Sequence, residues 1–367
     1  MSNLSELLGG AGGGASSIIK VTRTSNVILA SADVGKLIDI TSGTFTQTFS
    51  ASATLGDGWY CYIRNNGTGD ITLDPNSSET IDGLTSFIMY PNEVRLIQCD
   101  GSTLTSIVLS AFHKVFTSSA TFIKPTGYSG FSVYLLGAGG GGGGGGVVNG
   151  RGGQGGTGAS AISFNFDPDD LSSSESVTIG AGGTSASTTA GTDGGDTTFQ
   201  TLKGFGGNGG NAGKTYAQSY TAVVGGGVGS TTLDPAPGLL YNQYGNGSAQ
   251  WGGAGKSGWN MNNSPQQEGK GSIFGGASGG NGQYNAYQSG DGGVSRNISV
   301  LSGGGGSGTI NGAGADGGTY GAGGGGSGAI GGNGGYGCGG GGGGSTSSAA
   351  YSGGNGGSGL VEIWGIA

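Results

Sequence analysis

Charged residues, cysteine, proline and histidine are all scarce in this chain of 367 residues, and each scarcity excludes a class of protein. The 13 lysines and arginines form no cluster and face 21 aspartates and glutamates, so we expect no nucleic-acid partner, because nucleic acids require clustered positive charge. Three distant cysteines (Cys61, Cys99 and Cys338) provide neither a disulfide framework nor a zinc site. Seven prolines, with glycine in consecutive runs, exclude collagen.

Long apolar runs are also absent. None approaches the roughly 18 residues that a membrane span needs, so we expect no membrane insertion. The opening MSNLSELLGGAGGG has neither a basic region nor a long apolar region, so it does not match a secretory leader, and we expect synthesis in a cytoplasm. Residues 1–17 are interpreted as an arm. Its Leu4, Leu7 and Leu8 suit attachment to a partner, and the alternative is plain disorder.

Residues 18–111 consist of short runs of β-branched and aromatic residues that recur about every 8–12 positions. Turn signals such as Asn65-Asn66-Gly67 and Asp100-Gly101 separate the runs. No helical periodicity continues past a turn or two. The pattern predicts a small antiparallel β-sandwich with a single core.

The order of the motifs in this region resembles a small β-domain common in bacteriophage tail and fibre proteins. The motifs are ASADVGKLIDIT (30–41), the segment 44–75 that contains WYCYIRNNGTGDITLDP, SSETIDG (77–83) and YPNEVRLIQCDGSTL (90–104). The resemblance implies a structural module of a virus particle and brings no active site with it.

Glycine is distributed very unevenly, because 15 of the 95 glycines precede residue 137 and the other 80 lie in residues 137–367. The stretch Leu135–Gly146 (LLGAGGGGGGGG) opens the glycine-rich field, and the strand-like run Leu360–Trp364 closes it. We expect Phe131–Leu136 and Leu360–Trp364 to pair as neighbouring strands. Residues 112–367 are therefore interpreted as one glycine-rich domain, with strands at 112–136 and 360–366 on either side of the glycine field.

Glycine runs carry no side chain to bury, and glycine destabilises a helix by about 1 kcal/mol per position relative to alanine. A flexible linker would have few aromatic rings, whereas this field has many tyrosines and tryptophans. The tandem nonapeptide of a calcium-binding β-solenoid does not recur. Polyglycine II segments, with three residues per turn and hydrogen bonds only to neighbours, fit best. The predicted fold is mainly β: an N-terminal antiparallel β-sandwich, then packed polyglycine II helices closed by β-strands.

Both ends of this field are similar to the glycine-rich domain found at the ends of phage tail fibres. The matching segments are FTSSATFIKPTGYSGFSVYLLGAGGGGGGGG (116–146), residues 162–199 and GGNGGSGLVEIWGIA (353–367). The resemblance implies a receptor-binding adhesin in which glycine helices pack as a slab and recognition loops project from its end. It does not extend to the middle, roughly residues 205–300.

We expect no enzyme, no cofactor and no metal site. Gly276-Ala277-Ser278-Gly279-Gly280 fits G-x-S-x-G but lacks the strand and helix of a nucleophile elbow, and the sole histidine, His113, lies far before it. Asp193 and Asp196 are interpreted as caps of backbone groups rather than as a glycosidase pair.

Aromatic residues alternate with amides in the middle of the glycine field. This mixture suits recognition of sugars or proteins, because rings stack on partners and amides bond to them. Packing of the rings over the slab and contacts between copies are the alternatives. The candidate receptor-binding residues are Tyr216, Tyr220, Tyr241, Tyr244, Trp251, Trp259, Asn260, Asn262, Tyr284 and Tyr287.

These patterns predict a tail-fibre adhesin located on the virion, with homotrimeric symmetry as is usual for fibres. Leu4, Leu7 and Leu8 are the candidates for attachment to other tail or virion proteins. The receptor would be a host-surface glycan or an outer-membrane protein. One alternative is a head-decoration or other structural protein of the virion with no receptor contact, and another is an enzyme that acts on surface glycans.

Overall fold

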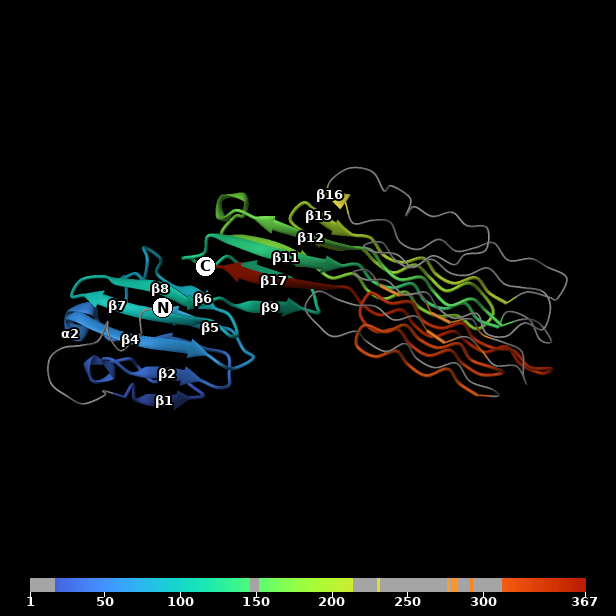
Figure 1. The fold of residues 1–367 in the computed structure, drawn as a ribbon, viewed down its shortest axis with the longest axis horizontal. Helices are drawn as coiled ribbons and strands as arrows, with labels where there is room; N and C mark the ends of the chain where they lie inside the picture. The colour runs from blue at the N-terminus through green and yellow to red at the C-terminus, as the bar shows by residue number, and fades with distance from the viewer. Residues whose placement is uncertain are drawn as a thin grey trace. The chain divides into compact units, whose positions relative to one another are not determined.

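The computed structural model describes residues 17–145, 152–213, 230–231, 276–277, 279–280, 282, 289, 291–292 and 312–367. The chain divides into two compact units, both mainly β as expected (Figure 1). The first unit contains the residues up to His113, together with Pro125–Tyr128 and Ala367. The second contains Lys114–Lys124 and Ser129–Ile366.

Two β-sheets form the first unit. The strands of the five-stranded sheet, in spatial order, are β1 (Lys20–Arg23), β2 (Leu37–Ile40), β4 (Asp57–Asn65), β7 (Val94–Asp100) and β8 (Leu104–Ser110). Those of the three-stranded sheet are β3 (Phe45–Thr48), β5 (Ile71–Asp74) and β6 (Phe87–Met89). The short helices η1 (Ser31–Asp33) and α2 (Ser52–Leu55) lie in the connections.

One hydrophobic core lies between these sheets. On β4 the alternate residues Trp59, Cys61 and Ile63 are buried, as the period of two along a strand requires. They belong to the same buried cluster as Leu73 of β5 and Phe87 of β6, so both sheets contribute to it. The expected single core of residues 18–111 is thus present.

Strand direction corrects the expected antiparallel sandwich. The pairs β1·β2, β2·β4 and β3·β5 are parallel, whereas β4·β7, β7·β8 and β5·β6 are antiparallel. The connections explain the difference, because β3 enters the second sheet between β2 and β4, and β4 then returns to the first sheet by a crossover. Parallel neighbours need such crossovers of a dozen or more residues. The alternation of buried residues is the same in both directions and does not reveal which one occurs.

A buried ion pair lies in the first unit. Arg95 is fully buried, with its Nε 2.5 Å from Oε1 of Glu93. Its guanidinium also donates to Oγ of Ser106 (2.8 Å) and to the carbonyl of Thr126 (2.7 Å), and lies 4.6 Å from the centroid of the Phe87 ring. These bonds tie the segment Pro125–Tyr128 to the sheet of the first unit.

Asp39 of β2 is held between two cations. Its side chain is 1% exposed and lies 2.7 Å from Nε of Arg64 and 2.9 Å from Nζ of Lys20. The hydrogen bond from Arg64, helped by Lys20 and opposed by burial, lowers the pKa of Asp39 below its ordinary value of 3.8. The ionised carboxylate therefore stabilises the fold above that value, and the contribution is lost as the pH falls below it.

We expect Asp39→Asn to reduce the loss in free energy of unfolding that occurs as the pH falls. The contribution is about 0.5–1 kcal/mol, because both cations are partly exposed to screening solvent. Urea unfolding at about pH 7 and pH 3 measures it: the variant should lose less stability between the two than the parent chain does. Asp57→Asn, at an exposed residue of β4, is the control that should keep the parent's loss. Equal losses for Asp39→Asn and the parent would contradict the prediction.

The second unit begins with two further sheets. The strands of one, in spatial order, are β12 (Ala161–Phe166), β11 (Gly130–Leu136), β17 (Leu360–Ile366) and β9 (His113–Phe116). Those of the other are β10 (Ala120–Ile123), β13 (Ser174–Thr178), β14 (Thr197–Phe199), β15 (Leu202–Gly204) and β16 (Ser230–Thr231). The 3-10 helix η2 (Pro168–Asp170) follows β12.

The expected pairing of the two bracketing strands is confirmed. β11 and β17 are antiparallel, in register from Gly130 opposite Ile366 to Leu136 opposite Leu360. Val133 and Ile363, a facing pair on these strands, are fully buried. The glycine field therefore starts where β11 ends and returns to the sheet where β17 begins.

Candidate functional site

The run Gly139–Gly145 lies at the centre of a bundle of glycine segments. Successive N–H groups of the run donate to three neighbouring segments in rotation, as a helix with three residues per turn requires. The bonds, 2.8 to 3.2 Å long, are Gly139 to Gly357, Gly140 to Thr157, Gly141 to Thr192, Gly142 to Gly354, Gly143 to Gln154 and Gly144 to Thr189.

The carbonyls of this run accept hydrogen bonds from three more segments. The donors are Gly183 to Gly139, Gly340 to Gly140, Gly210 to Gly141, Gly343 to Gly143 and Gly213 to Gly144. Six segments thus surround one, as in a hexagonal array. This hydrogen-bond pattern is the polyglycine II packing that the sequence predicts.

The described segments form a slab of three rows, defined here by their hydrogen bonds. The middle row contains 188–196, 138–145, 338–344 and 321–327; the upper row contains 180–186, 351–359, 329–337 and 312–318; the lower row contains 205–213, 152–160 and the described residues of 276–282. Figure 1 shows these segments running side by side beyond the end of β11.

Side chains do not fit along the glycine runs 139–145 and 339–344 at the centre of the middle row. A Cβ atom built on Gly142 would lie 2.0 Å from the carbonyl oxygen of Gly341, and one on Gly143 would lie 2.1 Å from that of Asn211. The obstructing atoms are backbone of neighbouring segments and cannot swing aside. The glycine residues of 139–145 and 339–344 are therefore required by the close packing of these two segments.

The sequence departs from glycine where a segment of the upper row faces outward. Because the segments repeat every three residues, Ile330, Asn333 and Tyr336 share one side of their segment, and Ser352 and Asn355 share the same side of the next. Ile330 is 53% exposed, and Asn333 and Asn355 are exposed. One position in three is thus free to carry a side chain.

Some outward side chains bond to the next segment and form a ladder across the upper row. Oδ1 of Asp316 accepts the N–H of Asn333 at 2.6 Å, Oδ1 of Asn333 accepts that of Asn355 at 2.8 Å, and Oδ1 of Asn355 accepts that of Ser185 at 2.9 Å. Each bond satisfies a backbone donor at the surface of the slab.

Asp193 and Asp196 have the capping role expected for them. Oδ1 of Asp193 accepts the N–H of Gly209 at 2.7 Å, and Oδ1 of Asp196 accepts that of Gly206 at 2.9 Å. Asp196 also lies 2.6 Å from Nζ of Lys203. Both carboxylates are therefore used to hold the edge of the slab together.

Three described turns close the slab at the end opposite to β11 and β17. They are residues 186–190, 327–330 and 345–350. In the last of them Ser345 bridges to Ala350, and Oγ1 of Thr346 accepts the N–H of Ala349 at 2.9 Å. No sequence pattern singles out these turns, because their Ser, Thr and Ala residues have ordinary turn composition. The only sequence signal is that they interrupt or follow pure glycine runs.

The predicted site residues all lie outside the described residues. This holds for Leu4, Leu7 and Leu8 and for the ten receptor-binding candidates Tyr216, Tyr220, Tyr241, Tyr244, Trp251, Trp259, Asn260, Asn262, Tyr284 and Tyr287.

The described residues that directly precede two of the candidate stretches have defined positions in the slab. The N–H of Gly213, just before Tyr216, donates to Gly144, and that of Gly282, just before Tyr284, donates to Gly153. Both acceptors lie toward the end of the slab that carries the three turns. The last described residue before each of these two stretches therefore lies at that end.

Metal-ligand groupings and the thiol of Cys338 were the remaining candidates for a site. In the described part of the chain, no group of three or more His, Cys, Asp or Glu residues is placed to hold a metal ion. The Sγ atom of Cys338 lies inside the slab, 3.2 Å from the carbonyl of Tyr320, and burial raises the pKa of this thiol to about 12. Gly276 and Gly279, within the G-x-S-x-G match, lie in the lower row of the slab. Their N–H groups donate to the carbonyls of Ala159 and Gly156.

Comparison with known families matches residues 115–364 to the model of a glycine-rich domain. No curated protein matches the chain. Within the described residues, no helix combines the length and the apolar character needed to cross a bilayer.

Proposed function

The chain belongs to the glycine-rich domain family, and on that premise we propose that it is the receptor-binding adhesin of a bacteriophage tail fibre. The N-terminal arm and the first unit attach it to other tail or virion proteins. The slab presents loops to a host-surface glycan or outer-membrane protein. The mechanism is adhesion without chemistry, in which weak contacts are multiplied by the copies in a trimeric fibre.

The observation that carries this proposal is the separation, within the slab, of positions that admit only glycine from positions that carry side chains. Glycine is obligatory along 139–145 and 339–344 at the centre of the slab, so recognition side chains have to come from the outer faces and the ends. The described turns cluster at one end, and Gly213 and Gly282, which directly precede two of the candidate stretches, lie at the same end. These stretches contain the alternating aromatic and amide residues that suit binding to sugars and proteins.

Alanine substitution of Trp259 and Tyr284 tests the receptor contact. If these residues are central to the interface, each costs about 2 kcal/mol or more, so adsorption to intact host cells should fall by at least roughly thirtyfold. Adsorption is measured as the binding of labelled protein to cells, after thermal unfolding has shown that the fold is kept. Phe164→Ala, which removes an exposed aromatic ring of β12, is the matched control. Unchanged adsorption by the double variant would exclude these residues as the contact.

The rigidity of the slab favours a second candidate function, a head-decoration or connector protein in which the slab is a spacer. Replacing residues 241–274 with a glycine-serine linker separates the two, because it removes four of the aromatic candidates and keeps strand β16 and the slab residues Gly213 and Gly276. The adhesin loses host binding on this replacement, whereas the spacer keeps normal adsorption. A low-resolution map that places the chain on the tail or on the head decides independently.

A further inference from the structure

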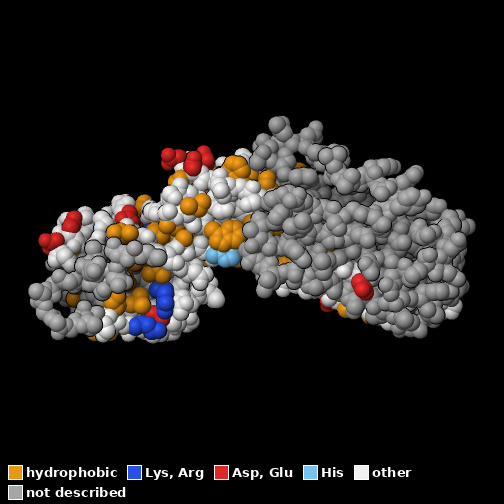
Figure 2. All heavy atoms as spheres, in the orientation of Figure 1, with side chains coloured by type: hydrophobic (Ala, Val, Ile, Leu, Met, Phe, Trp, Pro, Cys, Tyr) orange, Lys and Arg blue, Asp and Glu red, His pale blue; other side chains and the backbone are white. Residues whose placement is uncertain are grey.

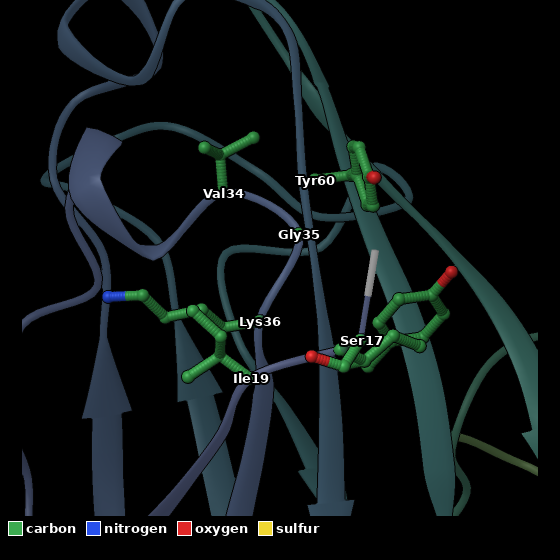
Figure 3. Close-up of a pocket in the computed structure, with 8 residues that line it drawn as sticks. Ser17, Ile19, Val34, Gly35, Lys36 and Tyr60 are labelled. Carbon is green, nitrogen blue, oxygen red and sulfur yellow. The ribbon is translucent and has the colours of Figure 1, made fainter. Parts of the chain in front are cut away.

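An open groove lies beside β1, β2 and β4 in the first unit (Figure 3). The residues that line it are Ser17, Ile18, Ile19, Val34, Gly35, Lys36, Tyr60 and Tyr62. Ile19 is 62% exposed and Val34 is 49% exposed. Exposed aliphatic side chains next to tyrosine rings are characteristic of surfaces that bind an apolar segment.

The groove opens onto the outer face of the five-stranded sheet. Leu37 lies opposite Tyr62, Tyr62 opposite Leu96, and Leu96 opposite Ile107. Directly opposed residues of neighbouring strands share a face, so these side chains form one apolar row. The row continues away from the groove to Ile107, which is 51% exposed.

Positive charge is in excess at the β1 edge of this groove. Asp39 is shared by Lys20 and Arg64, and Lys36, which lines the groove, pairs with Asp33. Three cations thus face two carboxylates, in a chain whose net charge is −8. Figure 2 shows lysine and arginine side chains gathered over this part of the first unit. The groove therefore fits a segment that combines apolar side chains with a carboxylate.

The segment directly before the groove has this composition. Residues 1–16 contain Leu4, Leu7 and Leu8, and Glu6 is their only charged side chain. The glycine-rich stretch 9–14 follows, and Ser17 and Ile18 are already part of the groove wall. The ten residues from Leu7 to Ser17 span at most about 35 Å when extended, which is ample to reach the groove.

We propose that the N-terminal arm docks in this groove of its own chain, with Leu4, Leu7 and Leu8 on Ile19, Val34 and the tyrosines and with Glu6 toward the cationic edge. Attachment of the arm to another protein then competes with docking, so the leucines are covered until that partner is met. The docking is a property of the free chain and does not depend on the receptor-binding proposal.

Disulfide trapping in the full-length chain tests the docking. Leu7→Cys is combined either with Val34→Cys in the groove or with Ile107→Cys outside it, two positions of nearly equal exposure on the first unit. The native Cys61, Cys99 and Cys338 are buried and do not compete. The measurement is the rate of disulfide formation with oxidised glutathione at low protein concentration, read on non-reducing gels.

A docked arm should form the Leu7–Val34 disulfide about ten times faster than the Leu7–Ile107 one, because docking raises the local concentration of the arm at the groove. Leu4→Ser and Leu8→Ser should reduce this preference. Equal rates at the two positions would overturn the proposal. A disulfide-linked dimer at Val34 would also overturn it, since the occupant would then be the arm of a second copy. Urea unfolding of each variant checks that the first unit is intact.

Discussion

Gly142→Val is expected to prevent the second unit from folding. Gly142 lies in the middle row, its N–H donates to Gly354 at 2.8 Å, and a Cβ there would lie 2.0 Å from the carbonyl oxygen of Gly341. Overpacking an ordinary core costs about 1–3 kcal/mol because side chains shift to make room. Here the obstruction is backbone that is itself bonded to other segments, so we expect a loss of more than about 3 kcal/mol.

A loss of this size is enough to unfold the second unit, because the net free energy that stabilises the slab is small. Ordering each residue costs about 1–2 kcal/mol, and a hydrogen bond returns only about 0.5–1.5 kcal/mol net. The middle row buries no large side chains that would add to this. The glycine field is held where the chain enters and leaves it by the paired strands β11 and β17, which bury aliphatic residues.

The thiol of Cys338 provides the measurement. It is buried in the slab, so thiol reagents at mildly alkaline pH should label it slowly in the parent chain and rapidly in Gly142→Val. Ala313→Val adds comparable bulk at an exposed position of the upper row and should leave labelling slow. If Gly142→Val is labelled as slowly as the parent, the requirement for glycine in the middle row is wrong.

Arg95→Met is expected to destabilise the first unit by about 3–5 kcal/mol. The substitution keeps most of the stem but leaves Glu93, which is fully buried, without its cation. An uncompensated buried charge is among the costliest single changes a protein can undergo. Urea unfolding of the first unit measures the loss. Adding Glu93→Gln to the variant removes the charge and should recover part of it.

The loss of stability in Arg95→Met should also depend on pH and should be smaller in acid than at neutral pH. Burial raises the pKa of Glu93 above its ordinary value of 4.5, and Arg95 opposes this. Removing Arg95 raises the pKa further, so the folded variant prefers the protonated acid. A raised folded pKa gives stability that is present below the unfolded pKa and is lost as the pH rises. Arg95→Met should therefore be less destabilised at about pH 4 than at pH 7, whereas a loss that is independent of pH would contradict this account.

Local patterns predicted the elements of the fold but not how they are combined. The alternating run Leu360–Trp364 and the glycine field before it are sufficient to predict a closing strand and polyglycine packing. Strand direction in the first unit is not predictable in this way, because parallel and antiparallel strands bury the same alternate residues. The direction depends on which sheet β3 and β4 enter, and that is a property of the whole chain.

Contacts within the slab were inaccessible to sequence reasoning for a related reason. Asn333 and Asn355 are 22 residues apart, and Asn355 and Ser185 are 170 residues apart, yet they form successive bonds of one ladder. Nothing in their local sequence indicates which segment lies beside which. The capping role of Asp193 and Asp196 was predictable, because a short carboxylate in a glycine-rich turn bonds to nearby backbone. The receptor contact remains a prediction, since its ten candidates lie outside the described residues.

The arrangement of bonds around the segment 338–344 has a mechanical consequence. All six N–H groups of Gly339–Gly344 donate, and all seven carbonyls from Cys338 to Gly344 accept, to segments that surround it on every side. These bonds are transverse to the segment. A pull on the turn 345–350, directed away from β17, therefore loads them together in shear and cannot open them one after another. A slab with this construction resists tension along the direction of its segments.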